Sequence, residues 1–169
     1  DMRIPVSSLL AKPKDGFRTF MKTLTSGRVS IGALSVGTAI GAFERALKYS
    51  TEREAFGKPI NRFQSVGFKL ADMATKIEAS KLLVYHAAWL KDQGKNIMKE
   101  AAMAKLFASE TAMEVTTEAI QIHGGYGYVK EYDVERFFRD AKVLEIGEGT
   151  SEIQRLIISR AIMKDFLAL

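Results

Sequence analysis

The chain has 169 residues and a mass of 18.8 kDa, the size of one ordinary domain with room for a hydrophobic core. Hydrophobic residues make up 47% and charged residues 27%, with 3 Pro and 13 Gly, a composition that excludes disordered, collagenous and low-complexity classes. The sequence has no cysteine, which excludes a disulfide framework, a thiolate metal site and a thiol nucleophile. With 2 His and no carboxylate cluster, we also expect no metal site.

The net charge of +5, from 25 Lys+Arg against 20 Asp+Glu, makes nucleic acid the first partner to consider. Basic residues are scattered among acidic ones, however, with no run of four or more and no aromatic platform, so we expect no nucleic-acid partner. A diphosphate ligand, whose charges a few Arg or Lys side chains would meet, stays open.

The apolar stretches are too short for a membrane span. Residues 82–85, one of the longest, fall well short of the ~18–20 residues that a span needs. No signal-peptide pattern opens the chain. We therefore expect a soluble, cytoplasmic protein, or a protein of the mitochondrial matrix in a eukaryote.

The chain opens with a strand-like segment at residues 2–6, followed by a polar turn that ends at Gly16. It begins at Asp1 rather than Met, and we expect it to be cut from a longer protein. After Pro59 there is no proline, and apolar residues at helical spacing predict long helices.

The first helix is expected over residues 17–49, and its glycines, too many for a free helix, predict close helix packing. A loop that holds Phe56, Gly57 and Pro59 ends it. A second helix is expected over residues 63–90 and a third over residues 97–122, ended by Gly124 and Gly125.

A short amphipathic segment is expected at residues 134–139. The last helix begins near Ser151, whose side chain and Gln154 form a predicted capping-box pair. Long antiparallel helices with short loops predict an all-α fold: an up-down helical bundle of four long helices plus a short one, with a residual strand at the N-terminus.

Three loops carry more chemistry than turns require. Residues 53–59 place the planar cation of Arg53 beside Phe56 at a helix end, with Gln64 opening the next helix. Residues 121–128 hold three glycines in four positions, which can bring backbone amides close to a phosphate or an adenine. Residues 145–152 place Glu148 between two glycines, where a ligand can lie against the backbone. The plainer alternatives are a solvated charged turn, a glycine helix cap and an acidic residue at a helix start.

The three loops share their order and spacing with one enzyme family. The motifs Arg-x-x-Phe-Gly, Gln-Ile-x-Gly-Gly-x-Gly and Glu-Gly-Thr-Ser-Glu-Ile-Gln-Arg closely resemble the C-terminal domain of the flavin-dependent acyl-CoA dehydrogenases, most like short- and medium-chain members and their bacterial relatives. The resemblance covers essentially the whole chain. It implies that residues 1–15 are the end of the preceding β-domain and its linker, and that residues 16–169 are the C-terminal helical bundle domain.

The resemblance also implies a reaction, the α,β-dehydrogenation of an acyl-CoA to the trans-2-enoyl-CoA, with FAD taking the hydride. Glu148 matches the catalytic base that removes the α proton, and Gly149 keeps the backbone beside it accessible to substrate. A second lineage of the family places the base immediately before the arginine that matches Arg28. That position is Gly27 in this chain, so Glu148 is the only candidate.

Further contacts carry over residue by residue. Those on the diphosphate and adenine side serve the FAD of a neighbouring subunit: Arg53, Phe56, Gln64, Gln121, Ile122, His123, Gly124 and Gly125. Thr150, Ser151 and Glu152 are expected to touch the FAD of their own chain. Thr25, Ser26, Gly27 and Arg28 align with the acyl-CoA contact at the first helix.

The resemblance implies three kinds of partner: an acyl-CoA substrate, further copies of the chain in a dimer of dimers, and an electron-transfer flavoprotein as acceptor. Since the N-terminal and β-domains of the family complete the active site, we expect this chain alone to be inactive. Two alternatives stay open, a non-catalytic oligomerisation bundle and an acyl-CoA oxidase-type flavoenzyme. Many relatives have a tyrosine where Gly147 stands, so the acyl chain length is left open.

Overall fold

The computed structural model describes residues 1–10 and 12–168. Ala11 and Leu169, which the predicted domain ranges include, lie outside the described residues. The described chain is mostly helical, with helices α1 (Gly16–Glu52), α2 (Gln64–Asp92), α3 (Met98–His123), α4 (Val134–Ile146) and α5 (Ser151–Leu167). Short elements fill the connections: the 3-10 helices η1 (Val6–Ser8), η2 (Ile60–Arg62) and η3 (Gly124–Tyr128), and the antiparallel strands β1 (Glu54–Ala55) and β2 (Lys58–Pro59).

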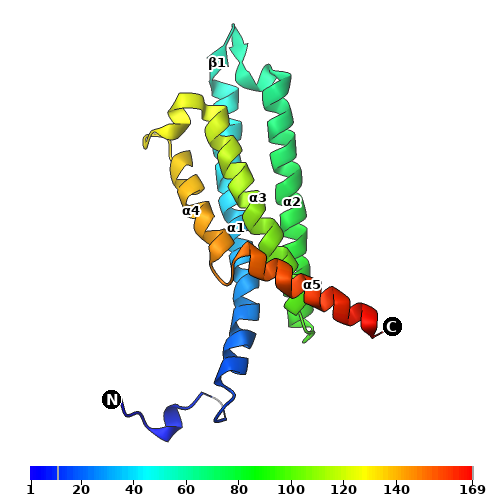
Figure 1. The fold of residues 1–169 in the computed structure, drawn as a ribbon. Helices are drawn as coiled ribbons and strands as arrows, with labels where there is room; N and C mark the ends of the chain where they lie inside the picture. Colours follow the sequence, from blue (N-terminus) through cyan, green and yellow to red (C-terminus); the bar gives the residue numbers. More distant parts are fainter. Residues whose placement is uncertain (11, 169) are drawn as a thin grey trace.

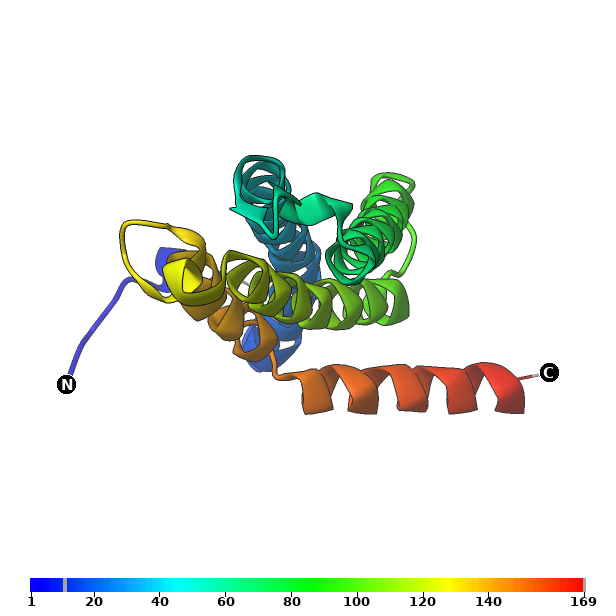
Figure 2. The same cartoon turned by 90° about the horizontal axis from the view of Figure 1, so that it is seen from above.

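The first four helices alternate in direction along one common axis (Figure 1). Helix α3 lies at the centre and packs against each of the other four. Helix α5 crosses the lower half of the bundle (Figure 1) and extends away from it, as the view from above shows (Figure 2). The predicted all-α bundle of four long helices and a short one is confirmed, and α4, with 13 residues, is the short one. No helix in the described part of the chain is both long and apolar enough to cross a bilayer.

Small side chains let the helices approach closely. Ala42 and Ala46 of α1 lie in one buried cluster with Ala112 and Ala119 of α3. A Cβ atom added at Gly32 would lie 2.9 Å from Cγ2 of Val84 on α2, tighter than any ordinary contact. The close packing predicted from the glycines of α1 is therefore confirmed at this position.

The predicted residual strand at the N-terminus is wrong. Residues 1–5 form no regular element, and Val6–Ser8 form the 3-10 helix η1. An extended segment is stable only when a neighbouring strand takes up its backbone hydrogen bonds. The only sheet among the described residues is the short β1–β2 pair, which these residues do not join.

The amphipathic segment predicted for residues 134–139 continues to Ile146 as α4.

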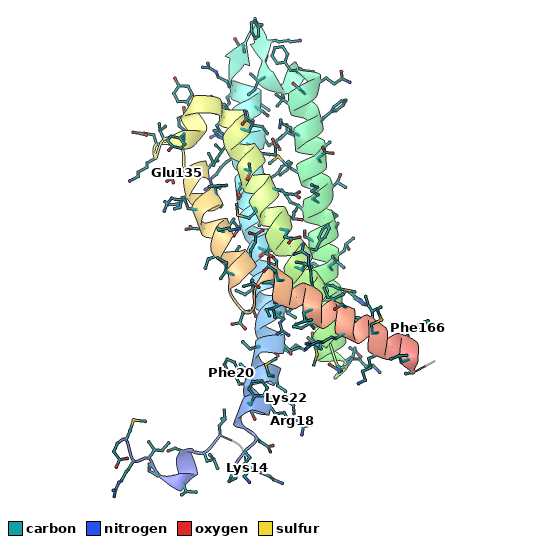
Figure 3. The ribbon with its side chains drawn as sticks, in the orientation of Figure 1. Lys14, Arg18, Phe20, Lys22, Glu135 and Phe166 are labelled. Atoms are coloured by element: carbon teal, nitrogen blue, oxygen red, sulfur yellow. The ribbon has the colours of Figure 1, made fainter. Side chains whose placement is uncertain are left out.

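Several large apolar side chains lie on the surface of the chain. The first turns of α1 extend past the ends of the neighbouring helices and expose Phe20, and the far end of α5 exposes Phe166 (Figure 3). The outer face of α2 exposes a further set: Phe68, Leu82, Tyr85 and Trp89. A monomer rarely leaves this much apolar surface in water.

Candidate active site

The predicted site residues form two groups at opposite ends of the bundle. Glu148 lies in the loop between α4 and α5, against Gly27 near the start of α1. Arg53 is the C-terminal cap of the same helix, 26 residues further along, which corresponds to about 39 Å at ~1.5 Å per residue. Residues 121–125 lie near Arg53 at this far end, where α3 ends. Within one chain the two groups are therefore held well apart.

The Glu148 carboxylate rests directly on α1. A Cβ atom at position 27 would lie 2.6 Å from Oε2 and 2.7 Å from Cδ of Glu148, so the carboxylate occupies the space that any side chain there would need. This brings the predicted base together with the predicted acyl-CoA residues, which share that part of the helix. Among the described residues, no ion pair or side-chain hydrogen bond engages the carboxylate.

The backbone around Glu148 has an unusual conformation. Its φ is +55°, and that of Gly149 is +99°. The left-handed region costs a residue with a side chain about 1–2 kcal/mol, so other contacts must hold Glu148 there. The Nε2 of Gln154 donates to the carbonyl oxygens of Glu148, at 3.2 Å, and of Gly149, at 2.8 Å. The Nζ of Lys105 donates to the carbonyls of Glu145 and Gly149, each at 2.9 Å.

Lys105 and Gln154 are both completely buried, and sequence reasoning missed both as site residues. The available sequence signal for Lys105 is its place among the closely spaced alanines 101, 104 and 108 of α3, which are buried. The predicted capping box between Ser151 and Gln154 is wrong, because the Gln154 side chain turns inward to the loop carbonyls. Instead, Oγ1 of Thr150 accepts from the backbone N–H of Ile153 at 3.5 Å, which makes Thr150 the N-cap of α5.

Three buried polar side-chain atoms near the base have no hydrogen-bond partner in the described part of the chain, one each on Arg28, Ser151 and Gln154. Arg28 is 2% exposed; one of its terminal nitrogens is 3.5 Å from Oγ1 of Thr25, and its Nε is unpaired. Burial lowers the pKa of Arg28, and the charge of Glu148 partly opposes that shift. The Oγ of Ser151 is also buried and unpaired. Buried polar atoms without partners are rare, so their gathering around Glu148 sets this loop apart from the apolar core of the bundle.

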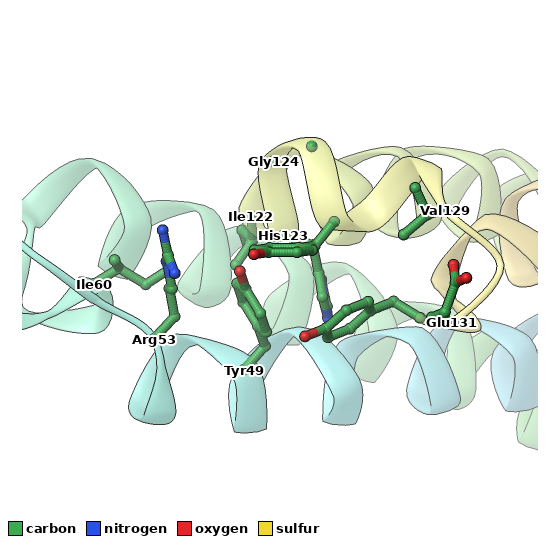
Figure 4. Close-up of a pocket in the computed structure, with 11 residues that line it drawn as sticks. Tyr49, Arg53, Ile60, Ile122, His123, Gly124, Val129 and Glu131 are labelled. Carbon is green, nitrogen blue, oxygen red and sulfur yellow. The ribbon is translucent and has the colours of Figure 1, made fainter.

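The far end of the bundle contains an aromatic cavity of about 760 Å³ (Figure 4). Tyr49 and Arg53 line one side, and the turn from Ile122 to Gly125 lines the other. The Tyr49 and His123 rings stack with their centroids 4.2 Å apart. Arg53 makes no ion pair with any described residue, so its guanidinium is available to a phosphate. The pocket therefore offers aromatic side chains and an unpaired guanidinium to a ligand.

The uncharged imidazole ring of His123 lines the cavity. Its Nδ1 lies 2.7 Å from the carbonyl oxygen of Ala119, so Nδ1 carries the proton and Nε2 is the acceptor. Burial lowers the pKa of His123, and the hydrogen bond to Ala119 only partly offsets this effect. The ring therefore stays uncharged at neutral pH.

The remaining predicted cofactor residues lie outside the cavity lining. Phe56 is 96% exposed at the tip of the β1–β2 hairpin, where its ring meets the edge of Phe63. The side chains of Gln64 and Gln121 are exposed at the same end of the bundle. At the other end, Glu152 is exposed on the first turn of α5. All four are accessible to a ligand or to a second copy of the chain, and their roles stay predictions.

Comparisons with known proteins place the chain in a family. The family model for the C-terminal domain of acyl-CoA dehydrogenases matches residues 14–163. The chain is 56% identical over 97% of its length to a probable acyl-CoA dehydrogenase of Bacillus subtilis, YngJ. It is 51% identical, again over 97% of its length, to the CarC subunit of the caffeyl-CoA reductase-Etf complex of Acetobacterium woodii. The chain spans 43% of each of these two relatives.

Among solved structures, butyryl-CoA dehydrogenase from Megasphaera elsdenii superposes with a TM-score of 0.95 at 47% identity. The match covers 96% of this chain and 43% of that one. A family model that matches most of the chain, together with relatives at about half identity, identifies the family and the fold. The chain belongs to the acyl-CoA dehydrogenase family, and it corresponds to the C-terminal helical domain of that family.

Proposed function

We propose that the protein containing this chain oxidises acyl-CoA thioesters to trans-2-enoyl-CoA, with Glu148 as the base that removes the α proton. One observation carries the proposal: an unpaired carboxylate held against Gly27, beside the residues aligned with the acyl-CoA contact. A scaffold domain has no need of such a carboxylate, which argues against the alternative of a non-catalytic oligomerisation bundle.

The proposed reaction breaks two C–H bonds. The Glu148 carboxylate takes the α proton, the electron pair of that bond forms the new double bond, and the β hydrogen leaves with its own electron pair as hydride. FAD, when bound, supplies the acceptor for that hydride. The backbone N–H of Glu148 has no partner among the described residues, so it can donate to the thioester carbonyl and make the α proton more acidic.

We propose that FAD lies between two copies of the chain. The Glu148 end of one copy and the Arg53 end of another would meet on one cofactor, since a single chain holds them about 39 Å apart by helix geometry. Arg53, His123 and the backbone at Gly124 and Gly125 would hold the adenine and diphosphate end. Thr150, Ser151 and Glu152 would contact the FAD on the base side.

Mixed oligomers test this arrangement. Glu148→Gln removes the base and Arg53→Ala removes a cofactor contact, and each variant alone should be inactive. In a mixed dimer, one of the two sites takes Glu148 from the Arg53→Ala copy and Arg53 from the Glu148→Gln copy, so both residues are intact there. Half of randomly mixed dimers are of this kind, so mixing restores about a quarter of wild-type activity. Mixtures that stay inactive, although the copies exchange, would show that each chain builds its own site.

The exposed apolar faces support the proposed dimer of dimers. Phe68, Tyr85 and Trp89 lie on one face of α2, which a second copy would cover. Light scattering of the full-length protein should report four chains. A single chain at micromolar concentration would contradict the assembly.

The direction of the reaction is open to a second candidate. One relative is named as a subunit of a caffeyl-CoA reductase-Etf complex, and the reverse reaction, reduction of an enoyl-CoA, would use the same residues. The experiment is a panel of saturated and unsaturated acyl-CoA substrates with the full-length protein. Reduction of an electron-transfer flavoprotein would support the dehydrogenase, enoyl-CoA reduction would support the second candidate, and peroxide formation would identify an oxidase.

A further inference from the structure

We propose that Lys105 is a positioning residue for the base: its ammonium group fixes the backbone on both sides of Glu148 and so keeps the carboxylate against Gly27. The inference rests on the proposed role of Glu148. It assigns a function to a buried lysine that the reaction itself does not use.

Lys105 bridges the segment that carries the base. Its Nζ lies 2.9 Å from the carbonyl oxygen of Glu145, three residues before Glu148, and 2.9 Å from that of Gly149, the residue after it. Since α4 ends at Ile146, the Glu145 carbonyl has no acceptor role left within its helix. One side chain of α3 therefore holds the end of α4 and the start of α5 at a fixed separation.

The packing of α3 against its neighbours gives no reason for a cation at this position. Lys105 is completely buried, with Ala101, Ala104 and Ala108 on the same stripe of α3, where an apolar side chain of similar length would pack. No carboxylate of the described chain lies within ion-pair distance of it. Burial lowers the pKa of Lys105; the charge of Glu145 partly opposes that shift, as do those of Glu110 and Glu152, and the charge of Arg28 adds to it. Burying an amine without an ion-pair partner is costly, and the two hydrogen bonds to backbone carbonyls are the contacts that offset this cost.

Those contacts resist the relaxation that Glu148 favours. A residue with a side chain prefers a negative φ, whereas Glu148 has a φ of +55°. Gln154 holds the carbonyl of Glu148 itself and shares that of Gly149 with Lys105. Without Lys105, the Glu145 carbonyl is free and the Gly149 carbonyl keeps one bond. The loop can then relax and carry the carboxylate away from Gly27, which slows proton removal without removing any group that binds substrate.

The test is Lys105→Met in the full-length flavin-loaded protein, which keeps side-chain length and removes both hydrogen bonds. The rate constant for flavin reduction by acyl-CoA should fall about 10- to 100-fold, the cost of a misplacement near 1 Å, while KM and flavin content stay close to wild type. The kinetic isotope effect with α-deuterated acyl-CoA should rise, because proton removal becomes more rate-limiting. Lys99→Met is the matched control on the same helix: it removes a partly exposed lysine that pairs with Asp165 and Glu100, and its rate should not change.

Three outcomes decide the inference. A wild-type reduction rate in Lys105→Met, with Glu148→Gln inactive, overturns the role of Lys105 alone. A Lys105→Met protein that loads flavin only in part, with a lower rate and a higher KM, shows a merely structural lysine and also overturns the inference. If Lys105→Met loads no flavin at all, Lys105→Arg replaces it as the test, because arginine retains a cation. A lower rate of flavin reduction in Lys105→Arg, at unchanged KM and unchanged flavin content, supports the inference, whereas a changed KM overturns it. Activity in Glu148→Gln would instead refute the proposed function.

Discussion

Gly27→Ala separates the stability of α1 from the placement of the base. The added methyl group would lie 2.6 Å from Oε2 and 2.7 Å from Cδ of Glu148, and the ordinary contact distance begins at 3.4 Å. The clashing atoms are the end of a flexible side chain, so the carboxylate can move rather than the helix. The required displacement is about 0.8 Å, within the range where catalytic misplacement costs up to ~10²-fold in rate.

The same substitution should not weaken the fold. Alanine in a helix interior is favoured over glycine by up to about 1 kcal/mol, so the melting temperature should stay unchanged or rise. We therefore expect the full-length Gly27→Ala protein to be as stable as wild type and to reduce its flavin about 10- to 100-fold more slowly on mixing with acyl-CoA under anaerobic conditions. Stopped-flow absorbance of the flavin and thermal unfolding measure the two effects.

Gly37→Ala is the matched control, because it lies on the same helix and a Cβ there would have open space around it. It should gain helix stability and lose no activity. A Gly27→Ala protein with the wild-type rate of flavin reduction would refute the reasoning, since it would show that the carboxylate does not need the space above position 27.

Three further predictions concern other parts of the chain. Gly127→Ala should destabilise the fold by about 1–3 kcal/mol in urea unfolding, because its Cβ would lie 2.6 Å from the carbonyl oxygen of Ile120, and a backbone atom cannot move aside; unchanged stability would contradict this. The hydrogen bond from Arg45, at 2.7 Å, lowers the pKa of Asp133 below its usual value, so the pair stabilises the fold above the unfolded-state pKa of about 3.9 and the gain is lost as pH falls through the folded-state value. Since both side chains are more than a third exposed, Asp133→Asn should cost no more than about 1 kcal/mol at pH 7, and the difference from wild type should shrink in acid; a difference that grows in acid would refute the assignment. The chain alone should be colourless after gel filtration with excess FAD, because it holds contacts to only part of the cofactor, and a yellow protein with stoichiometric flavin would refute that division of the site.

The helices were the predictable part of this fold. Apolar spacing located α1 to α3 within a few residues, and the glycines of α1 predicted its close packing. The prediction of an N-terminal strand is wrong because strand pairing depends on a second segment that local sequence does not reveal. Residues 1–5 join no sheet in the described chain. Thr150 and Ser151 are both good caps, so only the backbone angles at Thr150, φ −61° and ψ 165°, decide where α5 begins.

Candidate site residues that belong to a sequence motif could be predicted, whereas those that depend on tertiary packing could not. Glu148 stands out between two glycines, but its contact with Gly27 joins residues 121 positions apart, which no local pattern reports. Lys105 looks like a surface lysine in sequence, and its role depends on the carbonyls that α4 and α5 bring to it. The separation of the two site halves, by contrast, follows from the length of α1 and could have been worked out from the sequence.

The most direct test of the central claim is flavin reduction by acyl-CoA in full-length Glu148→Gln. Glutamine keeps the shape of the side chain and cannot take a proton, so substrate binding and flavin content should remain while the flavin stays oxidised. General-base loss costs about 10²–10⁴ in rate, and more is expected where no second base is present, as with glycine at position 27. Bleaching of the flavin by substrate at a rate close to wild type would show that Glu148 is not the base.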